Sequence, residues 1–134
     1  MPKPYINTLV HLAMVDGQVS DSELILIRKI AVAKGVSYFE LDRLIQNPEI
    51  LDLDASVEGL EEDELFEYLY SIVLLMKMDG KLDEKEIEFC RRCVGKLGYK
   101  KDVVEVLAER IESDHELGKN KEALKELAHG FLKP

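Results

Sequence analysis

The chain has 134 residues, 46% of them hydrophobic and 34% charged, as is typical of one folded domain rather than of a disordered segment. Its formal net charge of -9 disfavours nucleic acid and anionic membrane surfaces as partners. No apolar run approaches the roughly 20 residues of a membrane-spanning helix, and no signal peptide opens the chain, so we expect a cytoplasmic protein that does not span a membrane.

The chain opens with a helix whose apolar residues recur at helical spacing from Ile6 to Ala13. This pattern stops at Asp16-Gly17. Glycine permits the left-handed backbone conformation that commonly closes a helix, so a turn is expected there. The helix and its turn begin the first of two similar parts, which covers about residues 5–46.

Two more helices are predicted in this first part. Ser20 and Glu23, three residues apart, form a capping box that starts the second helix, and Gly35 ends that helix. Ser37 and Glu40 repeat the box at the start of the third.

A turn-rich acidic linker, about residues 47–60, follows, because Pro48 prevents the third helix from continuing. The linker has room for one short helix. The second part, about residues 61–113, again predicts three helices, and a last helix closes the chain. No segment alternates like a strand, so we predict an all-α fold, a single compact domain over residues 1–134 with seven to eight helices. The later helices are expected at about 62–76, 83–97, 100–113 and 119–131.

The two parts match at one ungapped offset. Asp79 follows Asp16 by 63 positions, and the same offset pairs apolar residues with apolar ones through the second helix of each part. We therefore predict an internal duplication with pseudo-twofold symmetry. The identical pairs at this offset include Asp16/Asp79, Gly17/Gly80, Glu23/Glu86, Arg28/Arg91 and Gly35/Gly98.

Four acidic residues, two in each part, form the main functional candidate. Two lie where apolar stripes end, three residues after Ala13 and after Met76, and two begin helices, four residues before Ile27 and Cys90. This helical phase predicts that all four carboxylates face inward, at helix ends that meet across a turn. The four residues are Asp16, Glu23, Asp79 and Glu86.

Clustered carboxylates resist ionisation together, so such a group needs a compensating partner. A hard divalent cation, Ca²⁺ or Mg²⁺, is the simplest one because it prefers oxygen ligands. The alternative is that no metal binds: Glu23 and Glu86 cap helices, Asp-Gly is an ordinary turn, and Arg28 and Arg91 neutralise the charge. Both interpretations stay open at the level of sequence.

At these residues the chain resembles the tellurite-resistance TerB family, in which a helix ends in an acidic-Gly turn and a Glu opens the next helix. The matching segment runs from Val15 through Asp16-Gly17 to Glu23. A related fold forms the N-terminal module of a DnaJ-type membrane co-chaperone. The resemblance implies an all-helical, duplicated domain over nearly the whole chain, a metal-binding role for the four acidic residues, no catalysis, and a part in stress or tellurite-resistance responses.

Other reactive side chains have simpler explanations. Cys90 and Cys93 form a C-x-x-C spacing, but they lie inside a predicted helix where the first part has isoleucines, so we expect small buried apolar residues. The Asp114-His115-Glu116 segment and His11, a possible fifth ligand near Asp16, are weaker candidates for metal binding.

No nucleophile has a recognisable histidine partner, and there is no G-x-S-x-G elbow or phosphate-binding glycine loop. We therefore expect a non-enzymatic protein without catalytic residues or an organic cofactor. Its expected ligands are a divalent cation and an unidentified protein partner. The alternative is a protein-interaction module without metal, in which the acidic residues serve only as helix caps.

Overall fold

Eight helices are the regular elements of residues 3–15, 19–77, 84–113 and 121–132, the ranges that the computed structural model describes. The predicted all-α fold class and the number of helices are confirmed. No helix in these ranges combines the length and apolar character that a bilayer crossing requires. In chain order the helices are α1 (Lys3–Ala13), α2 (Asp21–Ala33), α3 (Tyr38–Gln46), α4 (Leu53–Val57), α5 (Glu62–Lys77), α6 (Glu84–Leu97), α7 (Val103–Ser113) and α8 (Lys121–His129).

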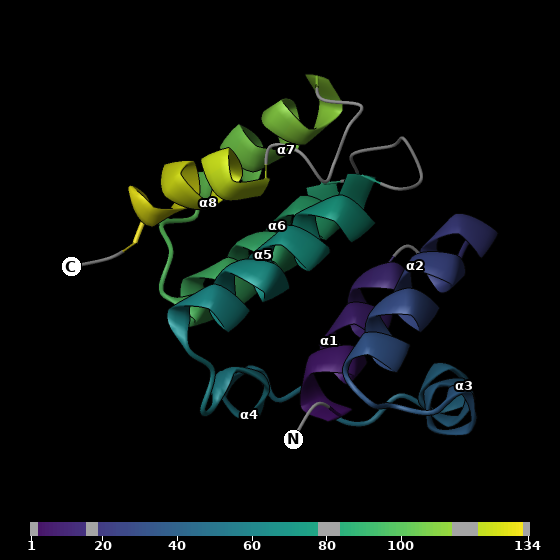
Figure 1. Ribbon diagram of the computed structural model, residues 1–134. Coiled ribbons are helices and arrows are strands. Elements are labelled where there is room, and N and C mark those ends of the chain that lie inside the picture. The colour runs from purple at the N-terminus through teal and green to yellow at the C-terminus, as the bar shows by residue number, and fades with distance from the viewer. Residues whose placement is uncertain (1–2, 16–18, 78–83, 114–120, 133–134) are drawn as a thin grey trace.

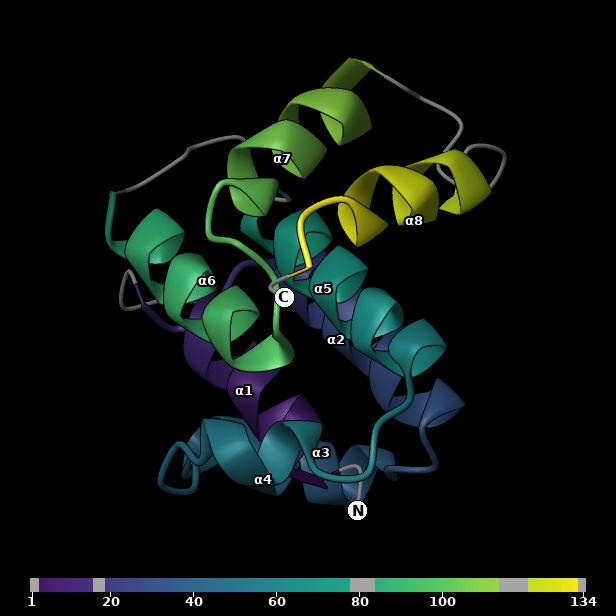
Figure 2. The ribbon, with the colours of Figure 1, turned by 90° about the vertical axis from the view of Figure 1, so that its left-hand side faces the viewer.

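Helices α1 and α5 lie at the centre of the molecule. They pack against each other, and each also contacts α2 and α6. Figures 1 and 2 show α3 and α4 across one end of this central pair, with α7 and α8 on the opposite side. Helix α5 is buried almost all round between Phe66 and Met76, as expected for a helix that is apolar on every face.

The helix starts follow the predicted caps in most details. At α2, the Ser20 hydroxyl oxygen accepts the Glu23 N–H at 3.1 Å, and Glu23 Oε1 accepts the Ser20 N–H at 3.0 Å. At α3, the Ser37 hydroxyl oxygen accepts the Glu40 N–H at 3.1 Å, but the Glu40 carboxylate receives the Ser37 hydroxyl at 3.5 Å rather than the backbone N–H. The second capping box is therefore only half formed, because the exposed Glu40 side chain is not held against the backbone.

Glycines end α2 and α6 in the same way. Gly35 and Gly98 have positive φ angles of 82° and 97°, a conformation that favours glycine. The Val36 N–H then donates to the Ala31 carbonyl at 2.8 Å, and the next residue after Gly98 makes the equivalent bond. The predicted stops at both glycines are confirmed.

The last two helices are shorter than predicted, since long-range bonds hold the residues at their ends. The Lys100 N–H donates to the Phe131 carbonyl at 2.6 Å, and an antiparallel bridge joins Tyr99 to Leu132. Residues 100–102 therefore form a turn, and α7 begins only at Val103.

The linker contains the expected short helix, α4. Asp52 caps it by accepting the Ala55 N–H at 3.0 Å. Asn7 on α1 fixes the preceding residues: its amide donates to the Glu49 carbonyl at 3.1 Å and its side-chain oxygen accepts the Glu49 N–H at 3.1 Å. The linker is thereby attached to the central helix α1.

Positions 63 residues apart have matching surroundings along α1 and α5. Tyr5 and Tyr68, which are related by this offset, stack on each other with ring centroids 4.0 Å apart. Thr8 donates from its hydroxyl to the carbonyl four residues earlier at 3.0 Å, and its counterpart Ser71 does the same at 2.9 Å. Tyr5 and Tyr68 thus lie next to each other where α1 packs on α5.

The outer helices match as well. Arg28 on α2 pairs with Asp42 on α3 at 3.8 Å, and Arg91 on α6 pairs with Glu105 on α7. All four residues obey the offset, since 42 + 63 = 105 and 28 + 63 = 91. We refer below to α1–α3 as the first unit and to α5–α7 as the second unit.

Candidate functional site

Two of the four predicted acidic residues lie inside the described ranges, and both are buried. Glu23 on α2 and Glu86 on α6 are each 3% exposed, although most glutamates in folded proteins face solvent. The prediction that these two side chains face inward is confirmed. Asp16 and Asp79 fall outside the described residues.

The capping box accounts for part of the surroundings of Glu23. One carboxylate oxygen, Oε1, accepts the Ser20 N–H, while the Glu23 N–H donates to the Ser20 hydroxyl. Glu86 begins α6 in the same position, but the residue before that helix is outside the described ranges. Helix capping is thus an observed role of Glu23, as the interpretation without metal requires.

The two arginines considered as neutralising partners make their ion pairs elsewhere. Arg28 pairs with Asp42, and Arg91 pairs with Glu105 and, at 3.7 Å, with Glu88. The pairs with Asp42 and Glu105 join α2 to α3 and α6 to α7, whereas Glu88 lies on α6 itself. The two arginines therefore hold the outer helices of each unit together, and their ion pairs are not with the buried glutamates.

A cleft of about 440 Å³ separates the end of α1 from the start of α6. Val15 lines it from the first unit, and Glu84, Ile87 and Phe89 line it from the second unit. Val15, the last described residue before Asp16, therefore lies beside the helix that carries Glu86. The described residues alone contain no group of three or more His, Cys, Asp or Glu side chains placed to hold a metal.

The cysteines are buried and free of disulfide bonds, as the sequence predicts. Desolvation raises the pKa of the Cys93 thiol to about 12 and raises that of Cys90 well above its usual range. The nearby Glu86 carboxylate adds to the shift at Cys90. A thiol that stays protonated near neutral pH is a poor nucleophile and a poor metal ligand, so both cysteines act as apolar core residues.

The two described histidines, His11 and His129, each contact a residue that is distant in sequence. His11 Nε2 donates to the Glu49 carbonyl at 2.7 Å, which ties it to the linker. His129 Nδ1 lies 2.5 Å from Glu62 Oε1, and the neighbouring Lys125 pairs with Asp63, so α8 is bound to the start of α5. Sequence analysis missed this role of His129 because nothing local in the sequence predicts a contact across 67 positions. The Asp114-His115-Glu116 segment lies outside the described residues.

A buried polar cluster lies where α1 meets α5. The Tyr5 hydroxyl is 3.5 Å from the Ser71 hydroxyl, and burial raises the pKa of Tyr5 to about 12. Burial also raises the pKa of Tyr68, while the hydroxyls of Ser56 and Thr8 counteract part of that shift. Both phenols therefore stay neutral at physiological pH, and their stacked rings pack α1 against α5.

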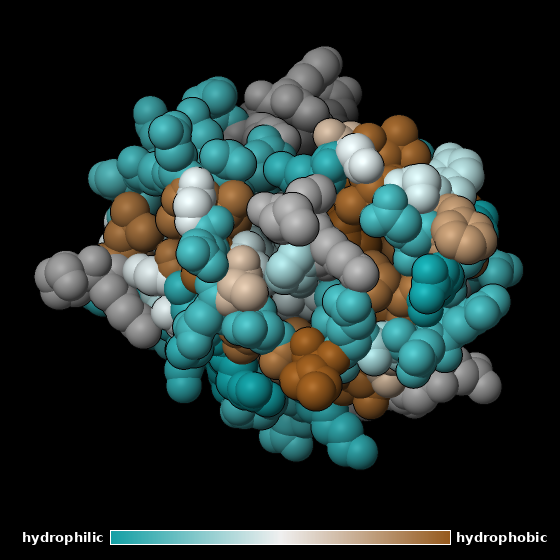
Figure 3. Space-filling model, turned by 90° about the horizontal axis from the view of Figure 1, so that it is seen from below, coloured by the Kyte–Doolittle hydropathy of each residue, from teal (hydrophilic) through white to brown (hydrophobic). Residues whose placement is uncertain are grey.

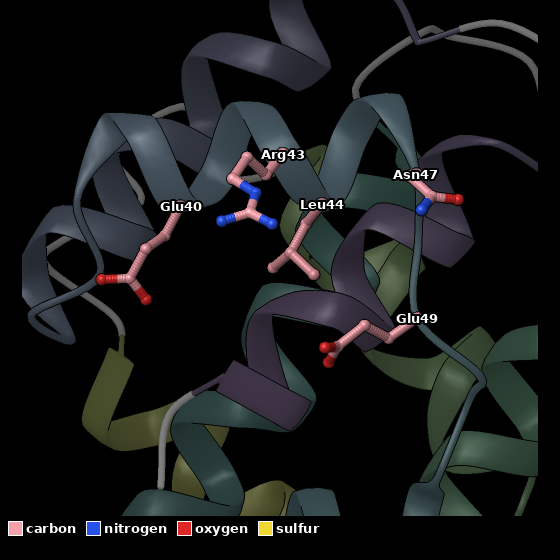
Figure 4. A pocket seen from close by; sticks show the side chains of 5 residues that line it. All are labelled: Glu40, Arg43, Leu44, Asn47 and Glu49. Carbon is pink, nitrogen blue, oxygen red and sulfur yellow. The ribbon is translucent and has the colours of Figure 1, made fainter.

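A hollow of about 210 Å³ opens beside α3, with the side chains of Glu40, Arg43, Leu44, Asn47 and Glu49 around it. Figure 4 shows the Leu44 side chain pointing toward α1, with the Arg43 guanidinium and both carboxylates around the same space. In the second unit, the positions corresponding to Glu40 and Leu44 are Val103 and Leu107, both fully buried on the helix against which α8 packs. The hollow thus lies beside positions of α3 whose counterparts on α7, Val103 and Leu107, are buried.

Comparisons of this chain with protein-family models, with curated proteins and with solved structures find no match. The likeness to the TerB family therefore rests on the acidic-Gly motif of the sequence.

Proposed function

We propose that this chain is a non-catalytic, TerB-like domain that binds a divalent cation, Ca²⁺ or Mg²⁺, through Asp16, Glu23, Asp79 and Glu86. The observation that carries the proposal is the burial of Glu23 and Glu86 at related positions of α2 and α6. A buried carboxylate costs free energy unless hydrogen bonds or a cation compensate for lost hydration. Oxygen ligands of this kind are those that hard cations prefer.

The cleft at the end of α1 also supports the proposed cation site. Val15 lines this cleft together with the first turns of α6, so Asp16 follows a residue that is already close to the second unit. A site that takes one carboxylate from a turn and another from the facing helix would use both units at once. Such a site would stabilise the contact between the two units.

We further infer that the two units are copies of one ancestral element. The shared burial, the shared ion pairs and the stacking of Tyr5 on Tyr68 support this inference. A duplicated unit would provide the Asp/Glu pair twice. A role in stress or tellurite-resistance responses follows only from the resemblance of the motif.

The second candidate is a protein-interaction module without metal. It is favoured by the complete capping box at Ser20, in which Glu23 already has a defined structural task. Under this alternative, the buried glutamates would be helix caps whose surroundings satisfy them without a cation. The two candidates differ in one measurable property, the response of folding stability to divalent ions.

The test is thermal unfolding of chelator-treated protein with Ca²⁺, Mg²⁺ or Zn²⁺ titrated in. A bound cation raises the melting temperature, because it binds the folded state and not the unfolded chain. We expect Ca²⁺ or Mg²⁺ to raise it in the wild type and not in the Asp16→Asn/Asp79→Asn variant.

A matched control is Asp52→Asn/Asp54→Asn, which removes two carboxylates at α4, away from the predicted site. It should keep the full cation response. The absence of a shift with every ion in the wild type would refute cation binding and leave the interaction module. An equal shift in the Asp16/Asp79 variant would show that the ion binds elsewhere.

A further inference from the structure

The strongly exposed large apolar residues of the described chain are concentrated on two neighbouring helices, α2 and α3. Five large hydrophobic side chains are strongly exposed, and all but Ile50 lie on α2 and α3. Figure 3 views the molecule from the end that carries α3 and α4, and hydrophobic side chains reach its surface in several places, one of them on the right, where α3 lies. The four residues are Ile25 (54% exposed), Val32 (56%), Tyr38 (58%) and Phe39 (70%), which we call the α2–α3 face.

The second unit has no such face. At the offset of 63 residues, the four positions are occupied by the polar or small residues Glu88, Gly95, Lys101 and Asp102. The helices of the second unit nevertheless form and pack in the same arrangement, with matching core positions and the matching arginine ion pair. Folding of the unit therefore does not require apolar side chains there, and their presence on the first unit needs another explanation.

Cationic side chains lie among these apolar residues. The Arg28 guanidinium is 5.8 Å from the centre of the Tyr38 ring, which connects α2 with α3, and Arg43 is 5.9 Å from the Phe39 ring. The exposed Lys29 lies between Ile25 and Val32 on the outward side of α2. Asp42 pairs with Arg28, and Glu40 next to Phe39 is exposed, so the charges around the face are mixed, and Lys29 is the exposed cation that lies directly between two of its apolar residues.

We propose that the α2–α3 face docks an amphipathic helix of a partner protein that carries carboxylates beside its apolar residues. Apolar contacts would cover Ile25, Val32 and Phe39, and charge complementarity would place acidic side chains near Lys29. A second copy of the chain fits less well. Two identical faces related by a twofold axis through the middle of α2 would place Lys29 against Lys29.

This inference does not depend on cation binding, since the residues that define the face are not among the four acidic ones. The experiment uses the full chain and a synthetic helix-forming peptide with leucines at helical spacing on one side and glutamates along both flanks. NMR chemical-shift changes locate binding, and a second peptide, with lysine in place of glutamate, tests the charge. We expect the acidic peptide to shift residues of α2 and α3, and the basic peptide to leave them unchanged.

Two variants separate the charged and apolar contributions. Lys29→Glu should weaken binding of the acidic peptide about tenfold, whereas Arg92→Glu, the same change at the related position of α6, should leave it unaltered. Ile25→Ala/Phe39→Ala, which changes no charge, should also weaken binding at least tenfold. Melting curves of all variants show whether each is folded.

The proposal is overturned if the acidic peptide does not bind, if it binds away from α2 and α3, or if the basic peptide binds equally well. It is also overturned if the chain forms dimers through this face, since a second copy would then be its partner. Sedimentation of the wild type and of Ile25→Ala/Phe39→Ala over a concentration series detects that outcome.

Discussion

Replacing Glu23 by Gln and by Ala separates its capping role from a role in cation binding. Gln keeps a side-chain oxygen that can accept the Ser20 N–H, now at 3.0 Å from the carboxylate, but it removes the negative charge. Ala removes both. The two variants should therefore differ in stability without a cation and be alike in their response to one.

The expected sizes follow from the local contacts. Without a cation, Glu23→Ala should cost about 1 to 2 kcal/mol, because it removes a cap bond in a buried setting. Glu23→Gln should stay within about 1 kcal/mol, since the lost charge at the first turn contributes only about 0.3 to 1 kcal/mol. A cation at a hundred times its Kd adds about 2.7 kcal/mol to the wild type, or very roughly 8 to 10 °C in Tm for a chain of this size.

Urea unfolding in chelator measures the first difference, and melting with added Ca²⁺ or Mg²⁺ measures the second. Glu40 supplies the control, because it occupies the same place after Ser37 but is exposed. Glu40→Gln should leave the cation shift unchanged. A full cation shift in Glu23→Gln would refute the ligand role, and an unchanged stability of Glu23→Ala in chelator would refute the capping argument.

Three further predictions concern the fold. Gly98→Ala should lower the free energy of unfolding by about 1 to 2 kcal/mol in urea titrations, since the φ angle of 97° strains any residue with a side chain. Burial raises the pKa of the Cys93 thiol to about 12, so as the pH rises this thiol ionises in the unfolded chain before it ionises in the folded protein. The free energy of unfolding should therefore fall from about pH 9 towards pH 12, by up to about 1.4 kcal/mol per pH unit. The fall should be less steep in Cys93→Ala. Ile25→Glu should change the unfolding free energy by less than about 0.5 kcal/mol, whereas a larger loss would mean that this exposed side chain supports the fold.

Helix starts and stops were predictable because local chemistry sets them. A hydroxyl that accepts an N–H three residues ahead, or a glycine that adopts positive φ, acts within one helical turn. The caps at Ser20 and Ser37 and the stops at Gly35 and Gly98 accordingly appear in the structure. The start of α7 was missed because the bond from Lys100 to Phe131 depends on a distant segment.

The candidate site likewise has features that local sequence predicts and features that depend on distant segments. Helical phase alone predicted the burial of Glu23 and Glu86, because the side that a helix buries follows from its apolar spacing. Contacts between distant segments carry no such signal in a single sequence. The cleft between Val15 and α6, and the pairing of His129 with Glu62, could therefore be found only from the structure.

The comparison of the two units separates what the fold requires from what function adds. Where related positions agree, as at Glu23 and Glu86 or at Arg28 and Arg91, the residue serves something that both units share. The buried glutamates belong to this group, so the proposed cation site would use a residue from each unit. The exposed residues of the α2–α3 face belong to the opposite group, since the second unit folds with Asp102 where the first has Phe39. The two proposals, a cation bound between the units and a partner bound by the first unit alone, are therefore compatible. Different variants should abolish the binding of the cation and the binding of the partner.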